Sequence, residues 1–285
     1  MSKSHSPAVK AYKNLPFLAS KGARELRILS EYLEPLQRFR EHKVKDTIVF
    51  FGSARTPEPA TARENLQQAR KSLKNASRQT RALKGAVSTA ERQVKMSRYY
   101  RDAQELARLM TEWSKSLKGT AHRFIVSSGG GPGIMEAANR GAAEAKGRTV
   151  GLGISLPKEP ANNQYISHDL AFEFHYFFMR KFWFFYPAKA MVVFPGGFGT
   201  LDECMEILTL IQTRKSSKEI PFLLYGKSYW SEVLNFDAMV RWGTISPQDL
   251  ELFRFVDTPE EAFRYLRQQL TESHLKPGAS RRGTG

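Results

Sequence analysis

The segment at residues 190–203 reads AMVVFPGGFGTLDE. Its first five residues are continuously apolar, which is typical of a strand that is buried on both faces of a parallel sheet. Three glycines follow within four residues, and the segment at 201–212 has the composition of a helix. This order of strand, glycine-rich turn and helix predicts that backbone N–H groups at a helix N-terminus are accessible to an anion.

Similar apolar runs recur along the chain and predict the rest of the sheet. They lie at residues 47–51, 123–127, 149–154 and 221–225, with weaker candidates at 171–174 and 253–256. Because helix-like segments separate them, we expect an α/β fold with a doubly wound parallel sheet in a single domain. Small-residue turns follow two more of these runs, at Gly52-Ser53 and at residues 128–133. Ligands of such sheets bind at the carboxyl ends of the strands, so these turns should converge with the one at 195–200.

Composition restricts the class of protein. The chain has 285 residues, of which 41% are hydrophobic and 25% charged, so it can bury a sizeable core. Its one cysteine, Cys204, excludes an intramolecular disulfide and a cysteine-based metal cluster. It has no apolar run long enough for a membrane span, and residues 1–13 lack the apolar core of a signal peptide. We therefore expect a cytoplasmic protein with no membrane partner.

The net charge of +16 is concentrated in the first part of the chain, because residues 1–118 carry +14 of it. Small or apolar residues recur at alternating spacings of four and three from Ala62 to Val94, with Arg and Lys between them. This heptad seam predicts a long basic helix or a helical hairpin, with Gly85 as a candidate turn, inserted at about residues 57–97. A second pattern at 99–117 suits the crossover helix that packs on the sheet.

The two ends of the chain lie outside this predicted domain. Residues 23–39 predict an amphipathic helix with four leucines on one face: Leu26, Leu29, Leu33 and Leu36. We therefore divide the chain into an N-terminal helical extension at 1–45, the sheet domain at 46–270 and a disordered tail at 271–285.

Glu203 has two interpretations. Thr200 and Glu203 have the spacing of a capping box, in which the glutamate only bonds back to the start of the helix. The glycines before it favour a carboxylate that faces a bound phosphate ester instead. Arg180 and Lys181 stand among aromatic residues, either on the surface or directed at a ligand.

Other cofactor and metal sites are not supported by the sequence. Neither glycine loop has the dinucleotide fingerprint, because Ile134 and Asp202 stand where a third glycine is required, and the chain has no Walker A sequence. No metal-ligand spacing links His168 and His175, so we predict no metal and no cofactor.

Residues 195–203 fit the PGGxGTxxE signature of the LONELY GUY (LOG) family. Members of this family are often labelled lysine decarboxylases. The chain resembles the family over about residues 46–226. The resemblance implies a Rossmann-like fold, usually dimeric, that hydrolyses the N-glycosidic bond of a nucleoside 5′-monophosphate such as AMP or a cytokinin riboside 5′-monophosphate. It implies that Arg180 and Glu203 form the catalytic pair. Phe177 and Phe178 stand where cytokinin-activating members typically have Met-His.

The expected substrate-binding residues come from the three turns and from the Arg180 segment. They are Gly52, Ser53, Ser128, Gly129, Gly130, Gly131, Met179, Lys181, Gly196, Gly197, Gly199 and Thr200. The expected partners are a nucleoside monophosphate and further copies of the chain.

Two alternatives remain from the sequence. The same scaffold can serve as a non-catalytic carrier of a nucleotide or cofactor. The basic insertion can contact nucleic acid, although we favour dimerisation through its seam because the seam contains no aromatic residue for base stacking.

Overall fold

The computed structural model describes residues 8–119, 122–155, 162–216, 218 and 220–276. Its centre is one sheet of seven parallel strands in the order β4-β3-β2-β1-β5-β6-β7. The strands are β1 (Thr47–Phe51), β2 (Ile125–Ser128), β3 (Thr149–Ile154), β4 (Ala171–Phe174), β5 (Ala188–Val193), β6 (Phe222–Tyr225) and β7 (Arg254–Val256). The predicted fold class is therefore confirmed, and each apolar run forms a strand with ends within two residues of the expected ones.

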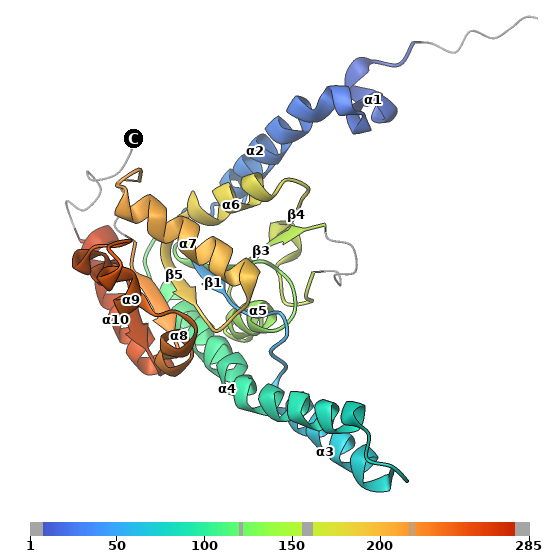
Figure 1. Cartoon of the computed structure of the whole chain (residues 1–285). Helices are drawn as coiled ribbons and strands as arrows, with labels where there is room; N and C mark the ends of the chain where they lie inside the picture. The colour runs from blue at the N-terminus through green and yellow to red at the C-terminus, as the bar shows by residue number, and fades with distance from the viewer. Residues whose placement is uncertain (1–7, 120–121, 156–161, 217, 219, 277–285) are drawn as a thin grey trace, which may run out of the picture.

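Helices cover both faces of the sheet (Figure 1). One layer contains α4 (Arg81–Lys115), α5 (Ile134–Glu144) and α10 (Pro259–His274), and the other contains α2 (Arg24–Glu41), α6 (Phe177–Phe185) and α7 (Phe198–Gln212). Successive residues of a strand point to opposite faces. Ile48 and Phe50 thus enter the core under α4, α5 and α10, whereas Val49 and Phe51 enter the core on the other face.

The remaining helices are short or peripheral. They are α1 (Leu15–Ala19), α3 (Pro59–Asn75), α8 (Lys227–Val233) and α9 (Phe236–Arg241), with 3-10 turns at Ala11–Lys13, Lys21–Ala23, His168–Leu170 and Pro247–Leu252. Within the described ranges, we find no helix that combines the length and the apolar character needed to cross a membrane.

The basic insertion is a helical hairpin, and its turn is not at Gly85. Helix α3 ends at Asn75, and α4 starts at Arg81, where the Thr80 side chain caps the helix by accepting a hydrogen bond from the Leu83 N–H. Gly85 lies inside α4, so the expectation of a turn there is wrong. Helix α4 then continues without a break to Lys115. The second helix of the hairpin and the crossover helix are therefore one element.

The N-terminal helix forms as expected, but its leucines do not share one environment. Leu26, Leu29 and Leu33 of α2 are about half exposed, at 46%, 50% and 49%. The face that packs on the core carries Tyr32, Leu36 and Phe39 instead, because the sheet and α6 contact α2 along that side.

The predicted start of the tail at residue 271 is too early, because it lies inside α10. Helix α10 runs through His274, so residues 271–274 are helical because Leu270 and the turns before it are anchored in the core. Residues 277–285 lie outside the described residues.

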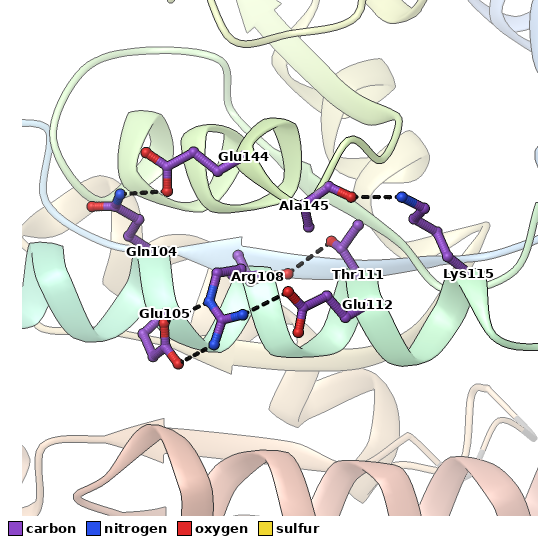
Figure 2. Close-up of polar contacts among 9 residues, drawn as sticks. Gln104, Glu105, Arg108, Thr111, Glu112, Lys115, Glu144 and Ala145 are labelled. Carbon is purple, nitrogen blue, oxygen red and sulfur yellow. Dashed lines mark hydrogen bonds and ion pairs between the residues drawn. The ribbon is translucent and has the colours of Figure 1, made fainter.

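Helices α4 and α5 make the tightest contact between helices. A Cβ built on Gly141 of α5 would lie 1.9 Å from the Gln104 carbonyl oxygen of α4, so the two backbones touch. Polar contacts flank this line (Figure 2): Gln104 Nε2 donates to Glu144 Oε2 at 2.7 Å, and Lys115 Nζ donates to the Ala145 carbonyl at 2.7 Å. On the outer side of α4, Arg108 pairs with Glu105 and Glu112.

Gly141→Ala should therefore destabilise the protein, by at least about 1–3 kcal/mol, because the added methyl group overpacks two rigid backbones. Gly85→Ala is the matched control. Gly85 lies on an exposed side of helix α4, where an added Cβ would meet nothing within 4 Å. This substitution should stabilise by about 0.5–1 kcal/mol through helix propensity. Urea unfolding measures both, and equal stabilities of the two variants would contradict the close contact.

Candidate functional site

The three predicted turns meet in one cleft at the carboxyl edge of the sheet. The cleft has a volume of about 880 Å³ and lies where the strand order reverses, between β1 and β5. Its walls come from residues 51–55, Gly129, Gly131 and residues 196–201, together with Arg180, Glu203 and Tyr229. The convergence expected from the sequence is therefore confirmed.

The glycine-rich turn after β5 presents a helix N-terminus to the cleft. Helix α7 starts at Phe198, and its N-cap residue, Gly197, supplies no side-chain cap. The first N–H groups of a helix have no partner inside the helix. A Cβ on Gly197 or Gly199 would meet nothing within 4 Å, so this rim is open. An anion can approach these donors closely.

Two side chains hold the turn from behind. A Cβ on Gly196 would lie 2.1 Å from Thr200 Oγ1, so the buried Thr200 packs directly beneath the glycine. The Tyr229 hydroxyl of α8 donates to the Gly196 carbonyl at 2.8 Å. The position of Gly196 thus requires glycine, because a larger residue would displace Thr200 from this support.

Glu203 and Arg180 form an ion pair on the wall of the cleft. Arg180 Nη2 lies 3.1 Å from Glu203 Oε1, and the side chains are only 14% and 12% exposed. The capping-box interpretation is wrong, because α7 starts at Phe198 rather than after Thr200. Burial raises the pKa of Glu203 from 4.5 to about 7, against the opposing effect of the Arg180 charge.

Aromatic rings fix the Arg180 guanidinium. Its Cζ atom lies 5.2 Å from the centre of the Phe177 ring and 5.6 Å from that of Phe184. The buried Arg180 Nε has no hydrogen-bond partner among the described residues. The guanidinium therefore has donor capacity beyond its bond to Glu203.

Four predicted binding residues lie outside the lining of the cleft. Lys181 pairs with Asp202 at 2.8 Å and with Glu206 at 2.7 Å, on the outer side of α7. Met179 is 8% exposed and packs in the core. Ser128 is fully buried, and its hydroxyl donates to Asn139 and accepts the Gly130 N–H. Ser128 and Gly130 shape the turn at 128–131 rather than face a ligand.

The sequence analysis missed several residues that line the cleft. They are Arg55, Met96, Met135, Ile154, Phe177 and Tyr229. Arg55 had a usable signal, because it follows the Gly52-Ser53 turn at the carboxyl end of β1. Met96 had none, since it belongs to α4, at the end of the predicted basic insertion.

Cys204 is fully buried, and burial raises the pKa of its thiol to about 12, so the side chain packs as a small apolar group. Within the part of the chain that the structure describes, no group of three or more His, Cys, Asp or Glu side chains is arranged to hold a metal ion.

Comparison with known proteins finds one similar family model and two similar curated proteins. Residues 135–266 match the family model described as "Possible lysine decarboxylase". The chain is 27% identical over 154 residues to the probable cytokinin riboside 5′-monophosphate phosphoribohydrolase LOGL5 of Oryza sativa subsp. japonica, a match that covers 53% of this chain and 61% of that protein. It is 33% identical over 82 residues to the cytokinin riboside 5′-monophosphate phosphoribohydrolase LOG3 of Arabidopsis thaliana, covering 28% and 38%.

Solved structures resemble the chain only weakly. The molybdenum cofactor carrier protein of Chlamydomonas reinhardtii is 17% identical with a TM-score of 0.42, over 79% of this chain and 99% of that one. The chain spans less than two thirds of the length of the curated relatives that it matches. The family model, which covers less than half of the chain, and both relatives agree with the signature at residues 195–203, so residues 135–266 are similar to proteins of the LONELY GUY type.

Proposed function

We propose that this protein hydrolyses the N-glycosidic bond of a nucleoside 5′-monophosphate, with the free base and ribose 5-phosphate as products. The observation that carries the proposal is the buried ion pair of Glu203 with Arg180, which lies on the wall of the same cleft as an open helix N-terminus. The curated relatives are named as phosphoribohydrolases, which supports this class of reaction.

The N-terminus of α7 is the proposed phosphate site. Its unpaired N–H groups and the helix dipole both favour a dianion, and Gly197 and Gly199 leave room for it. Arg55, which lines the same cleft, adds a positive charge after the carboxyl end of β1. These groups would bind the 5′-phosphate and so fix the position of the ribose.

Glu203 is the proposed catalytic acid–base group. Breaking the bond between the base and C1′ builds positive charge on the ribose ring, which a nearby carboxylate stabilises. The water oxygen then bonds to C1′ while the C1′–N bond breaks. Glu203 accepts a proton from that water and releases it to the departing base, which restores the carboxylate. A pKa of about 7 suits a group that must accept and release a proton near neutral pH.

The remaining walls of the cleft suit a planar base. Met96, Met135, Ile154 and Phe177 supply apolar surface, and the Phe177 ring also lies beside the Arg180 guanidinium. Thioether and aromatic groups pack well against flat, polarisable rings. The apolar walls therefore select for the base by shape, while the helix N-terminus binds the phosphate.

Glu203→Gln should lower the kcat for AMP hydrolysis by about 10²–10⁴-fold, because the amide can neither accept a proton nor balance the ribose charge. Chromatography of released adenine measures the rate. The matched control is Glu206→Gln, one helical turn further along α7, whose carboxylate pairs with Lys181 outside the cleft. It should retain a rate close to that of the unsubstituted protein.

A Glu203→Gln variant that hydrolyses AMP at the unsubstituted rate would contradict the catalytic role. Tight AMP binding by the unsubstituted protein with no base released would select the carrier function instead.

Glu203→Gln should also change stability in a pH-dependent way. The folded chain holds the Glu203 proton more tightly than the unfolded chain, since the pKa is about 7 rather than 4.5. The cost of ionising this buried carboxyl therefore appears as pH rises above 4.5 and is complete above about 7. The variant should exceed the unsubstituted protein in free energy of unfolding by up to about 3 kcal/mol at alkaline pH, and the difference should vanish in acid. Urea unfolding across this range tests it, and a pH-independent difference would refute the shifted pKa.

A further inference from the structure

The basic arm, which we define as residues 59–98, projects from the body of the protein (Figure 1). It comprises α3 and the first half of α4, and α3 packs against α4 rather than against the sheet. The arm carries ten Lys and Arg residues but only two acidic residues, Glu64 and Glu91. This length of chain adds charge to the molecule without contributing to the sheet.

The apolar seam of the arm is used inside the arm. Ala62 of α3 and Ala90 of α4 are buried, at 0% and 4% exposed, and the leucines and valines of the seam are half-buried between the two helices. The hairpin therefore already covers part of the seam through which two copies of the chain were expected to join. A partner would therefore contact the outer faces of the arm.

Two hydrogen bonds between the helices define those faces. Arg70 bonds to Glu91 at 3.0 Å on one side of the seam, and Asn65 bonds to Gln93 at 3.4 Å on the other. Helical periodicity assigns neighbouring residues to the same sides. Apart from Arg98, whose guanidinium bonds to the Tyr99 hydroxyl, the side of Arg70 has five cations and one acid: Arg63, Arg70, Lys74, Lys84 and Lys95, with Glu91. The side of Asn65 has no charge: Thr61, Asn65, Gln68, Ser72, Ala82, Ala86, Thr89 and Gln93.

The cations of this basic face are available to a partner. All five of their residues are exposed, and only Arg70 forms an ion pair within the described part of the chain. Arg63 and Lys74 are separated by about 16 Å along the helix. A nucleic acid duplex carries one phosphate charge per about 1.7 Å of its axis, so several phosphates face the arm over that length.

The surface chemistry favours a phosphate backbone over a lipid surface. Helices that bind membranes insert an apolar face, and none of the exposed large apolar side chains lies within residues 59–98. The arm also contains no Phe, Trp or Tyr, so it has no group on which bases can stack. We infer that the basic face of the arm docks on the phosphate backbone of nucleic acid, without sequence specificity.

Fluorescence anisotropy of a labelled DNA duplex of about 20 base pairs tests the inference. The affinity is measured at KCl concentrations between about 50 and 200 mM. We expect five phosphate contacts. A plot of the logarithm of the association constant against the logarithm of the salt concentration should then have a slope of about −4 to −5. The triple variant Lys74→Gln, Lys84→Gln, Lys95→Gln should reduce the slope to about −2 and weaken binding at least about 10-fold. A structured RNA of equal length should show the same loss.

The matched control is the triple variant Arg241→Gln, Arg264→Gln, Arg267→Gln. It removes the same charge from exposed positions on α9 and α10, and it should keep the affinity and slope of the unsubstituted protein. Both triple variants should hydrolyse AMP at the unsubstituted rate, so this test is separate from that of the proposed function.

Three results would overturn the inference. The first is an unsubstituted protein that does not bind the duplex at the lowest salt. The second is an equal loss of affinity in both triple variants, which would mean that only net charge matters. The third is binding to vesicles of anionic phospholipid but not to either nucleic acid, which would assign the arm to a membrane surface.

Discussion

The ion pair between Arg180 and Glu203 is the interaction on which the candidate site depends. Arg180 comes from α6, which follows β4 at one edge of the sheet, and Glu203 comes from α7, which follows β5 near its centre. Their contact at 3.1 Å fixes both helices beside the glycine turn and keeps an ionisable carboxyl group in a poorly solvated place. Burial then raises the pKa of Glu203 while the guanidinium limits the rise, so the group titrates near neutrality.

The sequence was sufficient for the sheet and for the centre of the site. Strands buried on both faces are continuously apolar, and glycine turns mark their carboxyl ends, so both signals are local. Contacts made in three dimensions were not predictable in this way. Tyr229 supports Gly196 from α8, and Lys181 bonds to Asp202 and Glu206 instead of entering the cleft beside Arg180. Neighbouring residues on a helix point in different directions. Arg180 and Lys181 are adjacent in the sequence, but only Arg180 lines the cleft.

The position of the hairpin turn was also not predictable from the sequence. Gly85 was the most visible break in the seam, but a glycine inside a helix costs only about 1 kcal/mol relative to alanine. The side-chain cap at Thr80 stabilises the start of the helix by a similar free energy. A helix start at this point also lets the two halves of the seam face each other. The leucines of α2 were misplaced for a related reason, since periodicity identifies an apolar stripe but not the surface that covers it. Leu26, Leu29 and Leu33 remain about half exposed.

The continuity of α4 links the cleft to the basic arm. One helix supplies the basic face of the arm, Met96 on the wall of the cleft and the surface that packs on α5 (Figures 1 and 2). A ligand on the arm would therefore lie at the end of a helix that also borders the cleft. The body of the fold holds that helix rigidly, because its backbone touches α5 at Gly141.

The most direct test of the central claim is an NMR titration of the Glu203 side-chain carboxyl carbon in the ¹³C-labelled protein. The account predicts an apparent pKa of about 7, which rises further in Arg180→Met because the opposing guanidinium charge is lost. A carboxyl that titrates near 4.5 in the folded protein would contradict the account, since the cleft would then hold an ordinary solvated acid.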